Sequence, residues 1–157
     1  MEAFSGNVIV ACGDVPLIRP DTFRAMIAAS GTDKVKAVVL TMELDNPTGY
    51  GRIVKDGAGN FRKIVEEKDA GADERAIREV NTGTYVFDKD LLFEGLKRIN
   101  TNNAQGEYYL PDALEHILRS GFTVRTMLLD DALEGSGVNT REELGRLEDY
   151  YRIRTRG

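Results

Sequence analysis

The chain has 157 residues, of which 41% are hydrophobic and 30% charged, and its net charge is -5 at pH 7. This length predicts one domain over residues 1–157. An acidic chain without a basic block argues against nucleic-acid or membrane-surface binding, and no apolar run is long enough to cross a membrane. The single cysteine excludes an internal disulfide, and residues 1–7 lack the regions of a signal peptide. We therefore expect a cytoplasmic protein.

The first apolar run extends from Val8 to Cys12 and is followed by Gly13 and Asp14. Five small or β-branched residues in a row predict a strand buried on both faces. Asp14 then lies at the carboxyl end of that strand, where ligands bind in open α/β sheets. A carboxylate there suits a divalent cation held against a phosphate. The alternative is a turn aspartate that bonds its own backbone.

Apolar spacing and turn residues predict the remaining elements. Strands alternate with helices, and one hairpin interrupts the alternation, which indicates an α/β sheet with mostly parallel central strands and an inserted β-hairpin. The expected elements are a helix from Pro20 to before Gly31, a strand over Lys36–Leu44, a hairpin of Arg52–Val54 and Phe61–Val65, a strand from Thr84 to Phe87, a helix over Leu91–Ile99 capped by Asp88, a helix through Leu114 and Leu118 that stops at Gly121, a strand over Thr123–Leu129 and a helix from Thr140 to about Arg154.

Most common catalytic patterns are missing from the sequence. There is no phosphate-binding glycine loop of the P-loop or dinucleotide type, no cluster of cysteines and histidines, and no serine nucleophile elbow. His116 is the only histidine, and without a partner pattern it is interpreted as a surface or packing residue.

What remains is a set of polar residues and glycines at strand ends, each of which also has a structural interpretation. Gly51 fits a turn, Glu66 a solvated acidic run and Asn81 a turn with Thr82 and Gly83. Asn139, with Glu142 three residues later, fits a helix cap. The candidate residues are Asp14, Gly51, Glu66, Asn81 and Asn139.

In order along the chain, six motifs resemble a known family. They are G-D-V-P-L-I, N-P-T-G-Y-G-R-I, I-V-E-E-K-D-A, E-V-N-T-G, N-N-A-Q-G-E-Y-Y-L and E-G-S-G-V-N-T-R. The resemblance is to the N-acetylglucosamine-1-phosphate uridyltransferase half of the bifunctional GlmU family, and it covers about Val8 to Tyr151. Six ordered motifs are far more specific than any single one.

This resemblance implies a Rossmann-like nucleotidyltransferase sheet. Family members join a sugar 1-phosphate to UMP from UTP and release pyrophosphate, which yields UDP-N-acetylglucosamine, a peptidoglycan precursor. By resemblance, Mg²⁺ is held by Asp14 and Asn139, and the sugar is contacted by Gly51, Glu66 and Asn81. One carboxylate and one amide suit Mg²⁺, which keeps other positions for water and phosphate oxygens. Tyr108 and Tyr109 either line the sugar pocket or pack with a polar tip.

The chain also departs from the family pattern. The glycine-rich nucleotide loop with its Arg and Lys, the uracil-reading segment and the acetyltransferase half are not found in the sequence, so we expect a domain truncated at its N-terminus. Cys12 and Ala11 replace bulkier residues expected beside Asp14. Without the cationic loop, little offsets the triphosphate charge, and we expect weak or no turnover by the chain alone.

Two alternatives remain open at this stage. One is a non-catalytic remnant of the fold that binds ligand and self-associates, because a first strand without its neighbours leaves an edge to be covered. The other is a nucleotidyltransferase for a different sugar phosphate or base, for instance a hexose phosphate with dTTP. The N-T-G and N-N-A-Q-G-E-Y-Y motifs favour the N-acetylglucosamine type.

Overall fold

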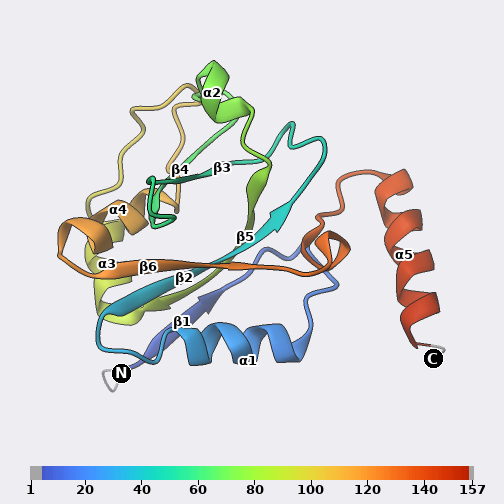
Figure 1. Cartoon of the computed structure of the whole chain (residues 1–157), viewed down its shortest axis with the longest axis horizontal. Coiled ribbons are helices and arrows are strands. Elements are labelled where there is room, and N and C mark those ends of the chain that lie inside the picture. Colours follow the sequence, from blue (N-terminus) through green and yellow to red (C-terminus); the bar gives the residue numbers. More distant parts are fainter. Residues whose placement is uncertain (1–4, 156–157) are drawn as a thin grey trace.

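The computed structural model describes residues 5–155 and contains a six-stranded sheet with helices on both faces (Figure 1). The expected alternation of strands and helices is present, with small shifts at the boundaries. In chain order the elements are β1 (Asn7–Val10), α1 (Pro20–Ala29), β2 (Val35–Glu43), β3 (Arg52–Lys55), β4 (Phe61–Val65), α2 (Ala72–Arg75), β5 (Glu79–Asp88), α3 (Lys89–Leu96), α4 (Asp112–Arg119), β6 (Thr123–Leu128), the 3₁₀-helix η1 (Ala132–Gly135) and α5 (Arg141–Thr155).

The strand directions correct the prediction of a mostly parallel sheet. The strand order is β4-β3-β5-β2-β6, with β1 on the other side of β5, and only the pair β2 and β6 is parallel. The sequence shows which strands follow one another but not which lie between others. β5 inserts between β1 and β2 and runs opposite to both. β1, β2 and β6 therefore share one direction although β1 does not pair with β2.

β1 is less buried than its apolar sequence predicts. Val8 and Val10 pack against the core, but Ile9 is 41% exposed. The reason is that β1 pairs only with β5, from Asn7 opposite Asp88 to Val10 opposite Tyr85. Its second edge has no partner strand among residues 5–155. The expected self-association through such an edge stays a prediction.

β5 begins earlier than predicted and includes the segment that was assigned to a turn. Asn81, Thr82 and Gly83 lie inside the strand, where Gly83 has a φ of 77° and the ladder with β2 shifts register between Val39 and Thr41. A glycine in this left-handed conformation marks an irregularity in the strand, not its end. This irregularity faces the edge of the sheet where β1 and β2 finish.

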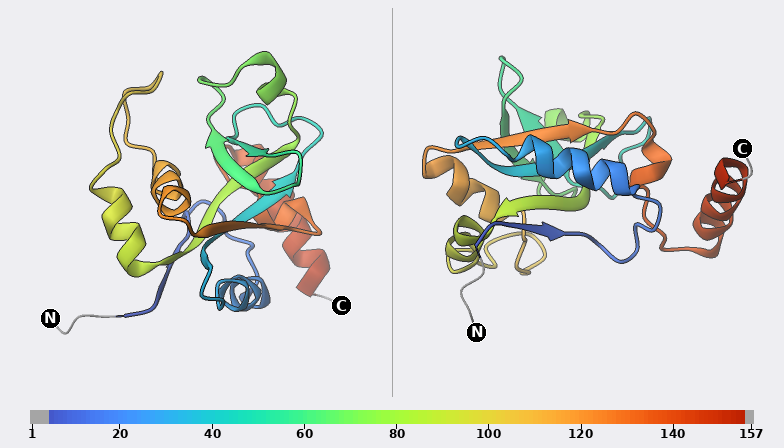
Figure 2. Two further views of the ribbon diagram at one scale, coloured as in Figure 1. Left: turned by 60° about the vertical axis from the view of Figure 1, so that its left-hand side comes forward. Right: turned by 90° about the horizontal axis from the view of Figure 1, so that it is seen from below.

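Helices lie on both sides of the sheet (Figure 2), and a hydrophobic layer lies on each of its faces. On one face Val39, Tyr85 and Phe87 pack with Leu114 and Ile117 of α4. On the other face, Met26 of α1 packs against alternate residues of β2 and β5 (Val38, Leu40, Met42, Val80 and Val86). Period-two alternation lets each central strand contribute to both layers. The confirmed class is thus an α/β fold with a doubly covered sheet.

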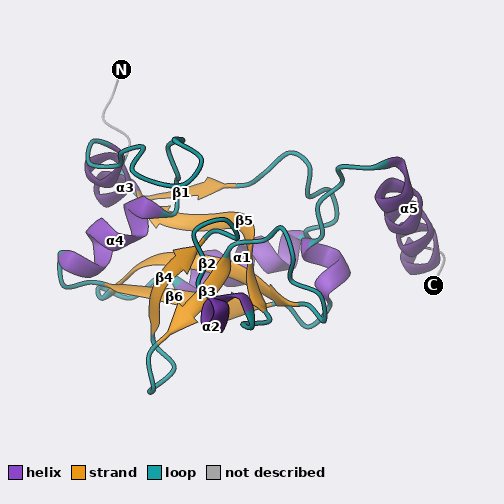
Figure 3. Ribbon diagram, turned by 90° about the horizontal axis from the view of Figure 1, so that it is seen from above, coloured by secondary structure: helices purple, strands orange, loops and turns teal. Residues whose placement is uncertain are grey.

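The helices differ in how firmly they join this body. Asp88 caps α3, as predicted, by accepting hydrogen bonds from the amides of Asp90 (3.1 Å) and Leu91 (3.2 Å). By contrast, α5 projects away from the sheet (Figure 3), and only Leu147 of this helix is buried. In the described part of the chain, no helix combines the length and apolarity needed to span a membrane.

Candidate functional site

A cavity of about 360 Å³ opens at the edge where β1 and β2 end and β5 begins. All five residues expected to bind metal or sugar line this one cavity: Asp14, Gly51, Glu66, Asn81 and Asn139. They come from five separate stretches of sequence. Their convergence follows from the topology, because the antiparallel insertion of β5 brings its amino end to the carboxyl ends of β1 and β2.

The two expected metal ligands lie on loops that touch each other. The amide of Val138 donates a 2.8 Å hydrogen bond to the carbonyl of Asp14. A Cβ placed on Gly137 would lie 3.7 Å from Asp14 Oδ2 and 3.9 Å from Asn139 Nδ2, so both side chains reach the same space. Both are exposed to solvent, as an ion that retains water ligands requires.

The structural alternatives for these two residues are not realised. The side chain of Asp14 forms no hydrogen bond with its own turn, nor with any other described residue, so it is not a turn-stabilising aspartate. The cap of α5 is formed by Thr140 and Glu143, not by Asn139 and Glu142: Glu143 accepts from the amides of Asn139 (2.7 Å) and Thr140 (2.8 Å), and Thr140 Oγ1 accepts from Glu143 N (3.2 Å). This capping box leaves the amide side chain of Asn139 available to a ligand.

The three expected sugar contacts form a second group, in which Gly51 touches both other residues. The carbonyl of Gly51 accepts a 2.9 Å hydrogen bond from the amide of Asn81. A Cβ at Gly51 would lie 2.9 Å from Glu66 Oε1, so only glycine leaves room for this carboxylate. Two hydrogen bonds orient the side chain of Asn81. Its Nδ2 donates to the hydroxyl of Tyr85 (2.6 Å), and its Oδ1 accepts from the backbone amide of Gly83 (3.0 Å).

Glu66 is not part of a solvated run, as the structural interpretation held. It is half-buried, and burial, together with the charges of Asp69 and Asp112, raises its pKa above the ordinary 4.5, while Arg52 acts in the opposite direction. The guanidinium of Arg52 is only 2% exposed and pairs with Glu67 at 2.5 Å. Glu66 therefore remains an acceptor without a bonded cation, which suits hydrogen bonds to sugar hydroxyls.

Several lining residues were not predicted from the sequence. Cys12 lies at the cavity with its Sγ 3.5 Å from the carbonyl of Gly83, and Glu143 and Tyr50 also line it. Burial and then the charge of Glu143 raise the pKa of the Tyr50 phenol. A hydrogen bond from the backbone of Gly137 partly offsets this rise. Tyr50 precedes Gly51 in the motif N-P-T-G-Y-G-R-I. This position beside a predicted site residue is the one sequence signal that could have identified Tyr50.

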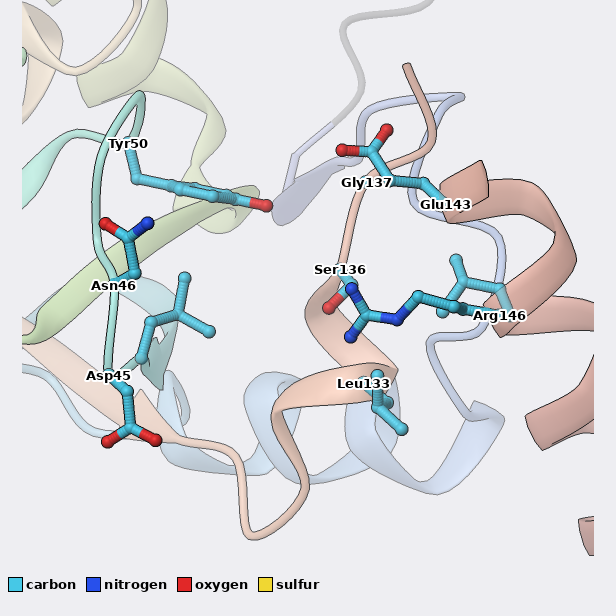
Figure 4. Close-up of a pocket in the computed structure, with 10 residues that line it drawn as sticks. Asp45, Asn46, Tyr50, Leu133, Ser136, Gly137, Glu143 and Arg146 are labelled. Carbon is cyan, nitrogen blue, oxygen red and sulfur yellow. The ribbon is translucent and has the colours of Figure 1, made fainter. Parts of the chain in front are cut away.

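Tyr50 also lines a second cavity of about 410 Å³ (Figure 4). Tyr50, Asn46 and Asp45 form one side of this second space, and Ser136, with Arg146 of α5, faces them from the other. The two cavities share Tyr50, Gly137 and Glu143. The loop before α5 is thus the common wall of both.

The charge of the 360 Å³ cavity bears on what it can bind. Asp14, Glu66 and Glu143 are carboxylates, and none of the described residues that line it is Lys or Arg. A phosphate would be repelled here unless a cation lay between it and Asp14. Residues 5–155 contain no group of three or more His, Cys, Asp or Glu placed to hold a metal. One carboxylate with one amide nevertheless fits Mg²⁺, because this ion binds through few protein ligands and takes the rest from water and phosphate.

The remaining candidates lie elsewhere. His116 is 3.3 Å from Glu94 on the α3–α4 side of the sheet, in agreement with its structural interpretation. Tyr108 is 70% exposed, and the Tyr109 hydroxyl accepts a bond from Gln105 (2.7 Å). Neither tyrosine is among the residues that line the cavity.

The profile of the family described as "Nucleotidyl transferase" matches residues 1–155, and the chain belongs to that family. The chain is 46% identical over 154 residues to the bifunctional protein GlmU of Pelotomaculum thermopropionicum, and 47% identical over 154 residues to that of Geobacillus sp. (strain WCH70). Each alignment covers 98% of this chain and 34% of the relative. The resemblance stated from the six motifs is confirmed, and the chain spans about a third of these relatives' length.

Solved structures share the fold at lower identity. A putative glucose-1-phosphate thymidylyltransferase from Bacillus anthracis superposes with a TM-score of 0.67 at 22% identity and covers 94% of this chain and 55% of its own. A CMP:2-keto-3-deoxy-manno-octonic acid synthetase gives 0.62 at 16% identity, with 94% and 62% covered. At these identities the likeness establishes the fold alone.

Proposed function

We propose that this chain forms the sugar-phosphate and magnesium site of a nucleotidyltransferase that makes UDP-N-acetylglucosamine and pyrophosphate from UTP and N-acetylglucosamine 1-phosphate. The observation that carries the proposal is the convergence of Asp14, Gly51, Glu66, Asn81 and Asn139 on one cavity. The identity to GlmU proteins supports the choice of sugar. A cytoplasmic location stays a prediction.

The two groups of lining residues have separate tasks in this reaction. Asp14 and Asn139 would hold Mg²⁺, which neutralises phosphate charge when bound. Glu66 and Asn81 accept and donate hydrogen bonds to the sugar ring and acetamido group, and the bare backbone of Gly51 lets the ring approach closely. No side chain becomes covalent. An oxygen of the sugar phosphate bonds to the α-phosphorus of UTP while pyrophosphate leaves, so the residues contribute positioning and charge.

The same cavity explains why we expect slow turnover by this chain alone. None of its described lining residues is cationic, so a triphosphate has no side-chain partner in this space. Loss of one such electrostatic contact costs on the order of 10²–10³ in rate in enzymes that rely on them. Robust release of pyrophosphate from UTP by the purified chain would contradict this part of the proposal.

The test is binding of UDP-N-acetylglucosamine by isothermal titration calorimetry, with Mg²⁺ or with EDTA. We expect Asp14→Asn to abolish the Mg²⁺-dependent gain in affinity. We expect Asn139→Ala to weaken it by about 10-fold or more, because loss of even an outer-sphere partner of a metal ligand typically costs about that much. Asp33→Asn, at an exposed position beyond α1 that does not line the cavity, is the matched control. Equal Mg²⁺ dependence in all these proteins would overturn the proposal.

The sugar and base are tested in the same experiment with UDP-glucose and dTDP-glucose. We expect both to bind more weakly than UDP-N-acetylglucosamine, because only the N-acetylated sugar offers the acetamido group to Asn81. Tighter binding of dTDP-glucose would favour the alternative of a thymidylyltransferase.

One observation favours the further alternative of a self-associating module. β1 has a single strand partner in the described chain and exposes Ile9 on its surface, and such edges pair with other strands. Sedimentation velocity at micromolar concentration tests it. A stable monomer that still binds the nucleotide sugar would contradict the module as a dimer and leave the site proposal intact.

A further inference from the structure

The most deeply buried carboxylate in the described chain is Glu134, which is 0% exposed and lies outside the cavity. Its Oε1 accepts bonds from the backbone amide of Arg19 (3.0 Å) and from the hydroxyl of Thr22, and its Oε2 pairs with the guanidinium of Arg19. Burying a charge is unfavourable unless it is paired and bonded, and here three donors meet that requirement.

The partners of Glu134 all belong to the segment that follows Asp14. Arg19 is the residue at the N-terminal boundary of α1, and its own side chain caps nothing. Glu134, which lies far away in the sequence, supplies the capping carboxylate at this end of α1. A negative charge at the amino end of a helix is favoured by the unpaired amides and the helix dipole. The carboxylate thus attaches η1 to the start of α1.

η1 is fixed from its other side as well. A Cβ on Gly135 would lie 2.7 Å from Leu129 Cδ1 and 2.8 Å from Thr82 Cγ2, so this glycine is pressed against the sheet. Three residues further on, the amide of Val138 bonds to the carbonyl of Asp14. The loops of Asp14 and Asn139 are therefore joined at two points, one at Glu134 and one at Val138.

We propose that Glu134 is a positioning residue that sets the separation of Asp14 and Asn139 by locking the Asn139 loop onto the start of α1. The inference rests on the proposed function, in which those two residues share a divalent cation. Glu134 does not touch the ligand. It acts through the loop, because a shift of η1 would lengthen the Val138–Asp14 bond and move Asn139 with it.

The test compares Glu134→Gln with a matched control, Asp88→Asn. Asp88 is also a carboxylate that caps a helix and pairs with a cation, Lys36 at 3.3 Å, but it lies at the opposite end of β5. Both substitutions are expected to lower thermal stability. Only Glu134→Gln is expected to accelerate amide hydrogen exchange at Val138 and to weaken binding of Mn²⁺, used as a paramagnetic probe of the Mg²⁺ site, by about 10-fold, as loss of outer-sphere support typically does.

Thr22→Val keeps the shape of the side chain and removes one hydrogen-bond donor to Glu134. This variant tests the positioning role of Glu134 if Glu134→Gln does not fold. We expect a smaller shift in the same direction for both readouts. Unchanged Mn²⁺ affinity in the folded Glu134 or Thr22 variant overturns the inference, whatever happens to stability. If Asp14→Asn also leaves Mn²⁺ affinity unchanged, the proposed function fails instead, which separates the two outcomes.

Discussion

The amide of Val138 donates a 2.8 Å hydrogen bond to the carbonyl oxygen of Asp14. This bond joins the loop after the first strand to the loop before the last helix, and each loop carries one expected metal ligand. Backbone bonds of this kind do not depend on side-chain identity, so the two loops are held together before any ion is present. The proposed metal site is therefore largely formed by the fold, which would lower the cost of binding an ion there.

Gly51→Ala tests the close contact between Gly51 and Glu66 in the proposed sugar site. The added Cβ would meet Glu66 Oε1 and Ile64 Cγ2, each at 2.9 Å, so one of them must move. We expect a loss of about 1–3 kcal/mol in the free energy of unfolding, as for other overpacked sites, and weaker binding of UDP-N-acetylglucosamine. Gly57→Ala is the control, since a Cβ there meets nothing within 4 Å. Equal affinity in the two variants would contradict a role of Gly51 in the pocket.

Glu66→Gln tests the burial of the carboxylate through pH. Because the pKa of Glu66 is raised above 4.5, the folded chain binds more protons than the unfolded chain between the two values. The contribution of Glu66 to the free energy of unfolding therefore falls as the pH rises from the pKa of the unfolded chain to that of the folded chain. We expect the variant to melt at a higher temperature than the unaltered chain at pH 7, with the gap closing below pH 4.5, and to bind the sugar nucleotide less well. A gap that widens at low pH would contradict this sign.

Cys12, the only cysteine, reports on its distance from Asp14. Burial and then the charge of Asp14 raise the pKa of the Cys12 thiol above 9.0, and only the thiolate reacts with alkylating agents. We expect iodoacetamide to modify Cys12 slowly near pH 8 and faster at higher pH. Asp14→Asn removes one of the two causes, so it should accelerate the reaction, whereas Asp33→Asn should not. The rate is measured by intact mass spectrometry, and equal rates in all three proteins would contradict the proximity.

The sequence was sufficient for local elements but not for strand directions. Asp88 before Leu91 predicted a cap because the carboxylate and the amides it accepts from are neighbours in the chain. The position of β5 between β1 and β2 depends on pairing between residues far apart, such as Val10 with Tyr85. No local periodicity encodes such a pairing, and the alternation with helices favoured the wrong, parallel arrangement.

The site shows the same division. Asp14, Glu66 and Asn139 were predicted as site residues only through ordered motifs that resemble a family. Taken singly, each fitted a turn, a solvated run or a cap. Glu134 begins the sixth of these motifs, but no role was predicted for it, because a buried carboxylate is indistinguishable in sequence from an exposed one until Arg19 and Thr22 are seen beside it. Residues that position a site through long-range contacts are thus visible only in the structure.

Gly135→Ala tests whether η1 must lie against the sheet. A Cβ at this position would be 2.7 Å from Leu129 Cδ1, 2.8 Å from Thr82 Cγ2 and 3.3 Å from Met42 Sδ, and these buried neighbours leave little room to move. We expect a loss of about 1–3 kcal/mol in the free energy of unfolding, together with faster amide exchange at Val138.

Gly145→Ala is the matched control for this prediction, because Gly145 lies in α5 and a Cβ there meets nothing within 4 Å. Alanine is favoured over glycine in a helix by about 1 kcal/mol, so the control should keep or slightly raise stability. Chemical denaturation measures both variants. If Gly135→Ala were as stable as Gly145→Ala, η1 would not be pressed against β2 and β5, and the loop that carries Asn139 would have another support.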